Sequence, residues 1–482
     1  MMRSLYSGVS GLKNHQTRMD VVGNNISNVN TTGFKSSRVT FSDTLSQTLS
    51  GASAPTENRG GTNPKQIGLG SATSAIDTLF TDGSVQSTGV NTDLCLSGNG
   101  LFIVKDGNLS YYTRNGNFKF DKEGYYVNSD GLKVQGWSAT TPGDAINTNG
   151  QPSEICIPAG KTMAASATKV ATFSKNLDAA EPRIASMTAT YDDGTTGAIP
   201  ASTATAVEVG KAFGGKVVSS LTLKMTDGTT TTETSGAFKL NNSKPKTTIA
   251  TIYDSLGNAH NVTIYMTKTK VDSTNGNEWT ISLDPAGSKT QTITESDGTT
   301  TTVKMNNDAV LQFDTNGGLK TGSGTATLTL TNGAGSGQSV HMTFDDVTQY
   351  AGSSTAFATT DGNAAGTLKS VSIDSSGVIT GTYTNGLNVQ EAQVAIAQFN
   401  NASGLTKTGN SLYTESNNSG TPNIGTISDL GCTVTPSSLE MSNVDMASEL
   451  TDMIVTQRGY QSNSKIITVS DELLETLINM KR

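Results

Sequence analysis

The chain has 482 residues, of which 15% are charged, and its 33 Lys and Arg residues against 41 Asp and Glu residues give a formal net charge of −8. Globular domains carry about 25% charged residues on average, so neutral polar side chains must cover much of this surface. An acidic chain is unsuited to binding a phosphate backbone, and no apolar run approaches the roughly 20 residues of a membrane-spanning helix, so we expect neither a nucleic-acid partner nor membrane insertion.

The N-terminal residues have a heptad pattern. Apolar residues recur every seven positions, with one more between the first two: Leu5, Val9, Leu12, Met19 and Ile26. This spacing places the side chains on one side of a helix and is typical of coiled coils. Asparagines and Thr31-Thr32-Gly33 then favour a stop. The pattern predicts a helix over 1–28.

Residues 29–70 have the composition of a linker. Gly51-Ala52-Ser53-Ala54-Pro55 and Gly60-Gly61-Thr62-Asn63-Pro64 are small, polar and rich in turn formers. We therefore predict a connecting region between the first helix and the middle of the chain.

The middle of the chain alternates with a period of two. Leu221, Leu223 and Met225 are separated by polar residues, and similar runs occur further along. Such alternation is typical of half-buried strands. Asp121-Lys122-Glu123-Gly124 between two such runs predicts a hairpin. Residues from roughly 70 to 438 are thus predicted to be all-β, in more than one unit.

The C-terminal residues have the same heptad spacing of apolar side chains as the N-terminal ones. Its apolar residues form one row spaced by seven, with two members of a companion row: Met446, Leu450, Met453, Tyr460, Ile467, Leu474 and Ile478. Ser437-Ser438-Leu439-Glu440 has the spacing of a capping box, which predicts that a helix begins nearby. We predict an inner helical segment over 440–482.

The two terminal helices allow two interpretations. They could be ordinary amphipathic helices packed on one globular core, or a coiled-coil pair that joins the ends of the chain. A lone helix in water is marginally stable, and the polar residues of the companion row, Gln457, Ser464 and Asp471, suit contacts between subunits better than a dry core. We favour the second interpretation and predict that the apolar residues of both rows form an assembly interface.

Catalytic chemistry finds little support. The chain has no His-Glu-x-x-His, Gly-x-Ser-x-Gly or Walker pattern. Its cysteines, Cys95, Cys156 and Cys432, are odd in number and far apart, which disfavours a disulfide framework and a thiolate zinc site. We expect no enzyme, no cofactor and no metal site.

Several strings resemble the family of bacterial flagellar rod and hook axial proteins. At the N-terminal end these are Leu5-Tyr6-Ser7-Gly8-Val9-Ser10-Gly11-Leu12, Gly23-Asn24-Asn25-Ile26-Ser27-Asn28, Thr31-Thr32-Gly33-Phe34-Lys35 and Thr78-Leu79-Phe80-Thr81-Asp82-Gly83-Ser84. The matching C-terminal strings are Asn443-Val444-Asp445-Met446 and Gln457-Arg458-Gly459-Tyr460. In the middle, Thr251-Ile252-Tyr253-Asp254-Ser255-Leu256-Gly257-Asn258-Ala259-His260 and Thr348-Gln349-Tyr350-Ala351-Gly352-Ser353 resemble the outer domain of the hook members.

The resemblance implies a nested axial subunit, mainly β, whose terminal helices form a coiled-coil inner domain. By motif order, 1–28 and 440–482 are the inner helices, 29–70 the connecting region, 71–144 with 365–438 the first β domain, and 145–364 one or two outer β domains. Residues 180–245 match nothing in this resemblance.

For function, the resemblance implies a structural subunit that polymerises into the hook, a flexible tubular universal joint that transmits motor torque to the filament. Its implied partners are further copies of the chain, the rod protein, the hook cap, the hook–filament junction proteins and the export apparatus. The implied location is the extracellular flagellum, reached through the flagellar channel, and the first 16 residues lack the apolar core of a secretory signal. Terminal helices of this kind are expected to be disordered before assembly.

Two alternatives remain for the function. A distal rod or hook-associated axial protein belongs to the same class, although 145–364 is large for a rod subunit. A secreted β-rich adhesin would explain the Thr-rich middle but not the paired terminal heptads.

Overall fold

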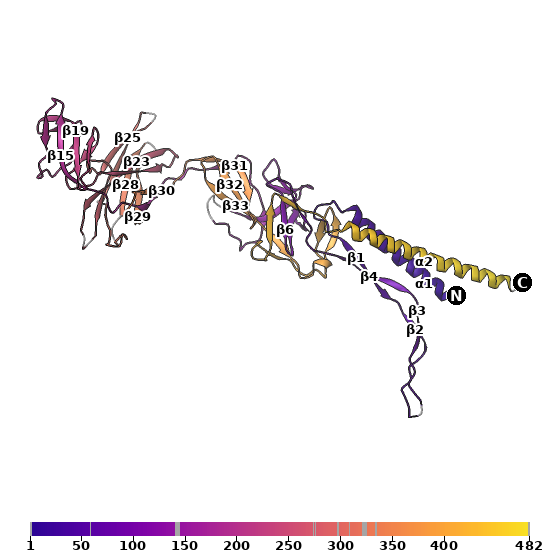
Figure 1. Ribbon diagram of the computed structural model, residues 1–482. Coiled ribbons are helices and arrows are strands. Elements are labelled where there is room, and N and C mark those ends of the chain that lie inside the picture. Colours follow the sequence, from indigo (N-terminus) through magenta and orange to yellow (C-terminus); the bar gives the residue numbers. More distant parts are fainter. Residues whose placement is uncertain are drawn as a thin grey trace. The chain divides into compact units, whose positions relative to one another are not determined.

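The computed structural model describes residues 2–480 except 58, 140–144, 273, 275, 296, 297, 308, 321–324, 333 and 334. Helix α1 (Met2–Ser27) and helix α2 (Met446–Asn479) bracket a series of strands (Figure 1). The predicted fold class, mainly β with helices at both ends, is confirmed. Among the described residues, neither helix is long and apolar enough to cross a membrane.

The chain divides into two compact units. Unit 1 comprises Met1–Lys161 and Leu368–Arg482, and unit 2 comprises Thr162–Thr367. The second unit is thus inserted into the first, which is a nested order along the chain. The predicted ranges 71–144 with 365–438 and 145–364 stay predictions, and position 144 lies outside the described residues.

Unit 1 contains a hairpin-like arm next to α1. Strand β1 (Ser37–Asp43) pairs with β4 (Ser71–Thr78), and β2 (Ser46–Ser50) pairs with β3 (Lys65–Gly68), all antiparallel. The predicted connecting region 29–70 is therefore partly paired into strands. Its residues 41–69 are exposed throughout the described part, which fits their small and polar composition.

The β body of unit 1 is one large sheet with short additions. Along its main path lie β31 (Gly366–Ile373), β32 (Val378–Tyr383), β33 (Asn388–Val394), β11 (Lys133–Ser138), β7 (Gly100–Asp106), β8 (Leu109–Thr113), β36 (Leu412–Thr414) and β35 (Thr406–Gly409). Attached to it are β9 (Phe118–Phe120), β10 (Tyr126–Asn128), β12 (Ser153–Glu154), β34 (Ile396–Gln398) and β37 (Asn423–Gly425), with one short helix at Ala402–Gly404. Two separate pairs are β6 (Leu94–Ser97) with β38 (Thr433–Pro436), and β5 (Val85–Ser87) with β39 (Ser438–Glu440).

The predicted hairpin at 121–124 is confirmed. Strands β9 and β10 pair antiparallel around it. The Asp121 carboxylate accepts hydrogen bonds from the backbone N–H groups of Glu123, at 2.9 Å, and Tyr125, at 2.8 Å, while Gly124 has a φ of +93°. An acidic side chain that bonds the turn backbone and a glycine that accepts positive φ explain why this string forms a turn.

Unit 2 contains a β-sandwich. One sheet has the order β22 (Lys246–Tyr253), β23 (Ala259–Lys270), β24 (Glu278–Ser282) and β27 (Val310–Gln312). The other has the order β25 (Thr290–Thr294), β26 (Thr300–Met305), β28 (Thr325–Asn332), β29 (Gly335–Thr348), β14 (Val170–Asn176) and β30 (Phe357–Thr360). Both sheets contribute to one core, in which Phe173 and Phe344 stack with ring centroids 4.5 Å apart.

Residues 184–240, most of the stretch that matched nothing in the sequence, form a β module with a core of its own. Its strands are β15 (Ile184–Tyr191), β16 (Thr196–Ala198), β18 (Ala212–Phe213), β19 (Lys216–Met225) and β20 (Thr230–Glu233), together with the pair β17 (Val207–Glu208) and β21 (Ala237–Phe238). Its apolar cluster includes Ile184, Leu221 and Leu223 and is separate from the sandwich core. Unit 2 therefore holds two cores.

The start of the C-terminal helix differs from the prediction. Residues 438–440 form strand β39, and α2 begins at Met446 after Asp445, whose side chain accepts a hydrogen bond from the N–H of Ala447 at 3.0 Å. The capping-box prediction was wrong because Ser437, its capping serine, has a φ of +56° and leads into strand β39, in which Glu440 is buried and paired with β5. Asp445 takes that role instead, and aspartate is among the residues preferred at a helix N-cap.

The unfolding of each unit should be measurable separately, because each unit contains one tryptophan. The chain has two tryptophans, and Trp137 lies in unit 1 while Trp279 lies in unit 2, both buried. In a Trp137→Phe background, Phe344→Ala should destabilise unit 2 by about 3–5 kcal/mol because it empties a stacked core site. Chemical denaturation followed by the fluorescence of Trp279 measures this change.

Phe357→Ala is the matched control, since the Phe357 side chain is 50% exposed in the same sheet. It should shift the midpoint far less than Phe344→Ala. Equal shifts would contradict the assignment of the core.

Candidate assembly interface

Helices α1 and α2 pack antiparallel within unit 1. Near the start of α1, the hydroxyls of Ser4 and Ser470 lie 3.5 Å apart. Near its end, the Asn25 side-chain amide donates to the carboxylate of Glu449 at 3.0 Å. Residue numbers thus rise along α1 while those of its contacts on α2 fall, and the two helices run alongside each other in Figure 1. We call the facing sides of the two helices the seam.

Glycines allow a close approach in the seam. A Cβ atom on Gly459 would lie 2.6 Å from Cε1 of His15, and one on Gly8 would lie 3.3 Å from a side-chain carbon of Ile467. Glycine lowers helix stability by about 1 kcal/mol relative to alanine, so these positions weaken each helix alone. The helices therefore gain their packing at the expense of their separate stability.

The structure splits the predicted interface residues into two groups. Half-buried are Leu5, Leu12, Met19 and Ile26 on α1 and Met453, Ile467 and Leu474 on α2. Exposed are Val9 on α1 and Met446, Leu450, Tyr460 and Ile478 on α2. The heptad rows thus do not all face the partner helix within one chain.

The buried side chains of α2 are polar ones that the heptad count did not include. Thr456 and Ser470 are the residues of α2 that are buried in the described part of the helix. The Thr456 hydroxyl donates to the backbone carbonyl of Asp452 at 2.7 Å, so its polarity is satisfied within the helix. Like the seam glycines, these small side chains allow α1 and α2 to lie close together.

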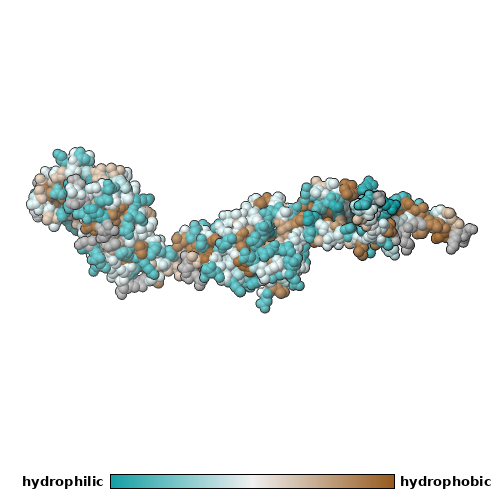
Figure 2. Space-filling model, turned by 90° about the horizontal axis from the view of Figure 1, so that it is seen from below, coloured by the Kyte–Doolittle hydropathy of each residue, from teal (hydrophilic) through white to brown (hydrophobic). Residues whose placement is uncertain are grey.

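A second row of apolar side chains runs along α2 beside the seam residues and is exposed. Its members are three or four residues apart and between 42% and 81% exposed: Ile466, Val469, Leu473, Leu477 and Met480. We call these residues the outer stripe. Figure 2 shows hydrophobic surface at the end of the molecule where α2 lies. Ile466, Leu473 and Met480 are themselves spaced by seven, so a heptad count begun one position before Ile467 finds most of this row.

Below the helices, charged residues from distant parts of the chain are buried together. Nζ of Lys35 lies 2.5 Å from Oε1 of Glu440, and a guanidinium nitrogen of Arg114 lies 3.3 Å from Oε2. None of the three side chains is more than 1% exposed. Asp82, partly exposed, lies 3.3 Å from Arg114 and brings the charges into balance. We call Lys35, Arg114, Glu440 and the neighbouring Asn443 the clasp.

Most polar atoms of the clasp are bonded, several of them to the backbone, although the buried Nε of Arg114 has no hydrogen-bond partner among the described residues. Lys35 also donates to the carbonyl of Thr81 at 2.6 Å, and the carboxylate of Glu440 accepts from the N–H of Gly83 at 2.8 Å. Burial lowers the pKa of the Lys35 ammonium below its usual value, and the carboxylate of Glu440 opposes this shift. A buried charge is tolerated only with such a partner and further hydrogen bonds.

Asn443 connects the two ends of the chain through its side-chain amide. Its oxygen accepts from the N–H of Ser36 at 2.8 Å, and its nitrogen donates to the carbonyl of Leu79 at 2.8 Å. Gly33, with a φ of +67°, fits beside this region because a Cβ there would lie 2.6 Å from the backbone nitrogen of Asn115. The clasp therefore uses residues from the strings that carried the family resemblance at both ends.

Two asparagines hold α1 to the arm. Asn14 donates to the hydroxyl of Ser71 at 2.7 Å. Asn25 donates to the carbonyl of Ser37 at 2.9 Å and accepts from its N–H at 3.0 Å. Sequence reasoning treated Asn25 as part of a helix stop, whereas its buried side chain forms a joint between α1, α2 and β1.

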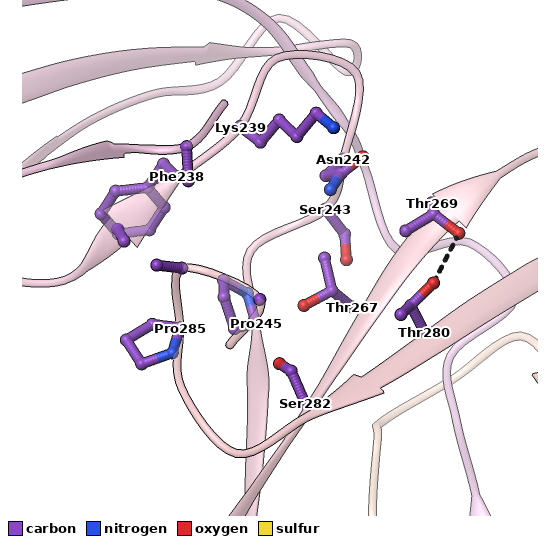
Figure 3. A pocket seen from close by; sticks show the side chains of 14 residues that line it. Phe238, Lys239, Asn242, Ser243, Pro245, Thr267, Thr269, Thr280, Ser282 and Pro285 are labelled. Atoms are coloured by element: carbon purple, nitrogen blue, oxygen red, sulfur yellow. Dashed lines mark hydrogen bonds between the residues drawn. The ribbon is translucent and has the colours of Figure 1, made fainter. Parts of the chain in front are cut away.

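Unit 2 holds a hollow of about 300 Å³ between its β module and its sandwich (Figure 3). Its wall carries hydroxyls of Thr267, Thr269, Thr280 and Ser282, and those of Thr269 and Thr280 lie 3.2 Å apart. A polar lining of this kind suits bound water. Cys95 and Cys432 are buried, Cys156 is half-buried, and all three are free thiols.

The seam makes a sharp prediction for its glycines. Gly459→Ala should weaken the helix pair by about 1–3 kcal/mol because the new methyl meets the ring of His15, even though alanine favours the isolated helix by about 1 kcal/mol. The measurement is the thermal loss of the circular dichroism signal at 222 nm for the full chain in ammonium sulfate, which strengthens apolar burial.

Gly23→Ala is the control, since a Cβ at Gly23 meets no atom within 4 Å. This variant should melt at the same or a higher temperature. A Gly459→Ala protein that also melted higher would show that the seam does not require the glycine.

Comparison with known proteins places these features in a family. Four family models match successive parts: "Flagella basal body rod protein" at 5–35, "Flagellar hook protein FlgE/F/G D1 domain" at 95–172, "Flagellar basal body protein FlaE D2 domain" at 223–366, and "Flagellar basal body rod FlgEFG protein C-terminal" at 435–480. The chain is 38% identical to the flagellar hook protein FlgE of Treponema pallidum over 515 aligned positions, and 38% identical to that of Borreliella burgdorferi over 509, with 100% of each chain covered in both cases. A crystal structure of Helicobacter pylori flagellar hook protein FlgE2 aligns with 74% of this chain and 100% of its own, with 16% identity and a TM-score of 0.47. The chain belongs to the flagellar hook protein FlgE family.

Proposed function

We propose that this chain is a structural subunit that polymerises into the flagellar hook, a flexible tubular universal joint that transmits motor torque to the filament. The observation that carries the proposal is the outer stripe of α2. A row of apolar side chains is exposed on a helix that is already packed on α1. Family membership makes further copies of the chain the natural partner for this row.

The energetics favour assembly through the helices. Full burial of an apolar side chain contributes roughly 1.5–3 kcal/mol. The outer stripe is about half exposed, so covering it would contribute on the order of 5 kcal/mol per subunit. Terminal helices with little burial of their own are marginal alone, and contacts among many copies would stabilise them.

The assembly interface combines the two groups of predicted residues with the outer stripe. We assign Leu5, Leu12, Met19, Ile26, Met453, Ile467 and Leu474 to the pairing of α1 with α2. We assign Val9, Met446, Leu450, Tyr460 and Ile478, with the outer stripe, to contacts between copies. The exposure of the second group in the single chain supports this division.

We propose that the order of domains predicted from the sequence corresponds to successive layers of the assembled tube. We propose that 1–28 and 440–482 form the inner tube, with 29–70 as the connecting region. We place the first β domain, 71–144 with 365–438, around the tube and 145–364 outermost. Two cores in unit 2 favour two outer domains within 145–364.

Bending would use contacts that exchange at little cost. The solvent faces of the outer strands are rich in Thr and Ser, whose individual hydrogen bonds contribute roughly 0.5–1.5 kcal/mol. Neighbouring outer domains could break and remake such contacts as subunits move through compressed and stretched positions. The exposed part of the connecting region would absorb the change in length.

We further propose the finer partners that the family implies: the rod protein, the hook cap, the hook–filament junction proteins and the flagellar export apparatus. Passage through the export channel requires an unfolded chain, and three free thiols are compatible with this route. We infer that the chain has a structural role without catalysis. Similarity to hook proteins over the whole chain favours the hook over a distal rod, a hook-associated protein or an adhesin.

Substitution in the outer stripe should prevent assembly. The double variant Leu473→Ser, Leu477→Ser should raise the protein concentration needed for sedimentable tubes by roughly tenfold or more, because two apolar contacts between copies are lost. The control, Glu475→Ser, introduces the same residue at an exposed polar position on the same turn. Ultracentrifugation and negative-stain microscopy measure tube formation, and unchanged assembly of the double variant would contradict the role of the stripe.

Stiffening the connecting region should reduce bending. Ala52→Pro with Ala54→Pro restricts exposed backbone in the loop beyond β2. Cells carrying this variant should form hooks of reduced curvature and swim poorly. Ala52→Gly with Ala54→Gly is the flexible counterpart, and equal motility and curvature in both strains would show that the loop does not govern bending.

A further inference from the structure

We propose that the clasp marks the point at which order stops in the unassembled subunit. It holds residues 33–36 and 438–443 in the same ordered state as the β body of unit 1, so that the end of α1 and the start of α2 lie side by side and in register before a neighbouring copy is present. The inference rests on the proposed function and deepens it by locating the boundary between the part that folds alone and the part that assembly orders.

The first observation is that separate bonds join the two ends within these short segments. The N–H of Gly33 donates to the backbone carbonyl of Glu440 at 2.8 Å. The ion pair of Lys35 with Glu440 and the bond from the Ser36 N–H to Asn443 lie along the same stretch. The N-terminal and C-terminal segments thus hold each other directly.

The second observation is that the clasp is anchored in the β body. Arg114, at the end of β8, donates to the carbonyl of Leu96 at 3.0 Å while it faces Glu440. The N–H of Met441 donates to the carbonyl of Ser84 at 2.9 Å, and Lys407 donates to the carbonyl of Lys35 at 3.0 Å. Strands far apart in the sequence therefore fix both ends.

The helices beyond the clasp have much weaker support. Over the described residues of α2, Thr456 and Ser470 are its buried residues, and the outer stripe lies in solvent. The arm that contacts α1 is exposed over 41–69 in its described part. Segments with few buried contacts open at low free-energy cost, whereas buried, bonded segments open only with the body around them.

The buried charges make the order of segment 33–36 depend on that of segment 438–443. Glu440 is the buried carboxylate that faces both buried cations, Lys35 and Arg114. Without it, two cations would stand in the interior with only the partly exposed Asp82 beside Arg114. Removing one partner of such a group leaves an uncompensated charge, so neither chain end should stay in place without the other.

Hydrogen exchange of the full-length, unassembled subunit tests the inference. Amides of 33–36 and 438–443 should exchange at least tenfold more slowly than those of α2 beyond residue 450. Glu440→Gln should accelerate exchange in both segments together, by tenfold or more, and should leave unit 2 unchanged. Because the readout uses free subunits, it is independent of whether tubes form, so its failure would not be confused with failure of the proposed function.

Two further variants complete the design. Glu154→Gln makes the same chemical change in an ion pair with Lys133 whose side chains are 33% and 40% exposed, and should change neither segment. Asn443→Ala keeps the clasp charges and should accelerate amide exchange in both segments by a smaller factor. If Glu440→Gln unfolds unit 1, this variant still tests whether the two segments are coupled. Wild-type segments that exchange as fast as distal α2, or variants that affect one segment alone, would overturn the inference.

Discussion

Burial of Lys35 and Arg114 around the carboxylate of Glu440 is the constraint on which unit 1 depends. These residues come from the segment after α1, from the end of β8 and from the strand before α2, so one buried charge group connects both chain ends to the β body. A carboxylate removed from water is costly unless its oxygens are fully bonded, and here cations and the N–H of Gly83 satisfy them. The positions of the end of α1 and of the start of α2 result from this arrangement.

From that base, α2 presents two different faces. Toward α1 it combines half-buried apolar residues such as Ile467 with the small residues Gly459, Thr456 and Ser470, which allow close approach. Beside them lies the outer stripe, which is apolar and exposed. A monomeric protein would normally bury such a row. In a subunit of the hook family, we propose that further copies cover it.

The sequence predicted the fold class and the helical ends because period seven and period two are strong signals of backbone structure. It could not give the rotation of each helix about its own axis. Leu450 and Ile478 belong to the predicted rows but are exposed. Ile466 and Leu473, each one position before a residue of the predicted row, were not predicted and form part of the outer stripe. The start of α2 was misplaced because a capping pattern at 437–440 is local, while the burial of Glu440 depends on residues hundreds of positions away. The clasp could not be predicted for the same reason. Lys35, Arg114 and Glu440 are far apart in the sequence, and nothing near any one of them indicates that the fold brings the three charges together.

Cryo-electron microscopy of tubes assembled from the full-length chain tests the central claim most directly. A helical reconstruction should show α1 and α2 paired in the inner layer, with the side chains of Ile466, Leu473 and Leu477 packed against neighbouring copies and the clasp intact at the base of each pair. A reconstruction in which those side chains remain in solvent, or a protein that forms no tubes at concentrations where related hook proteins do, would contradict the account.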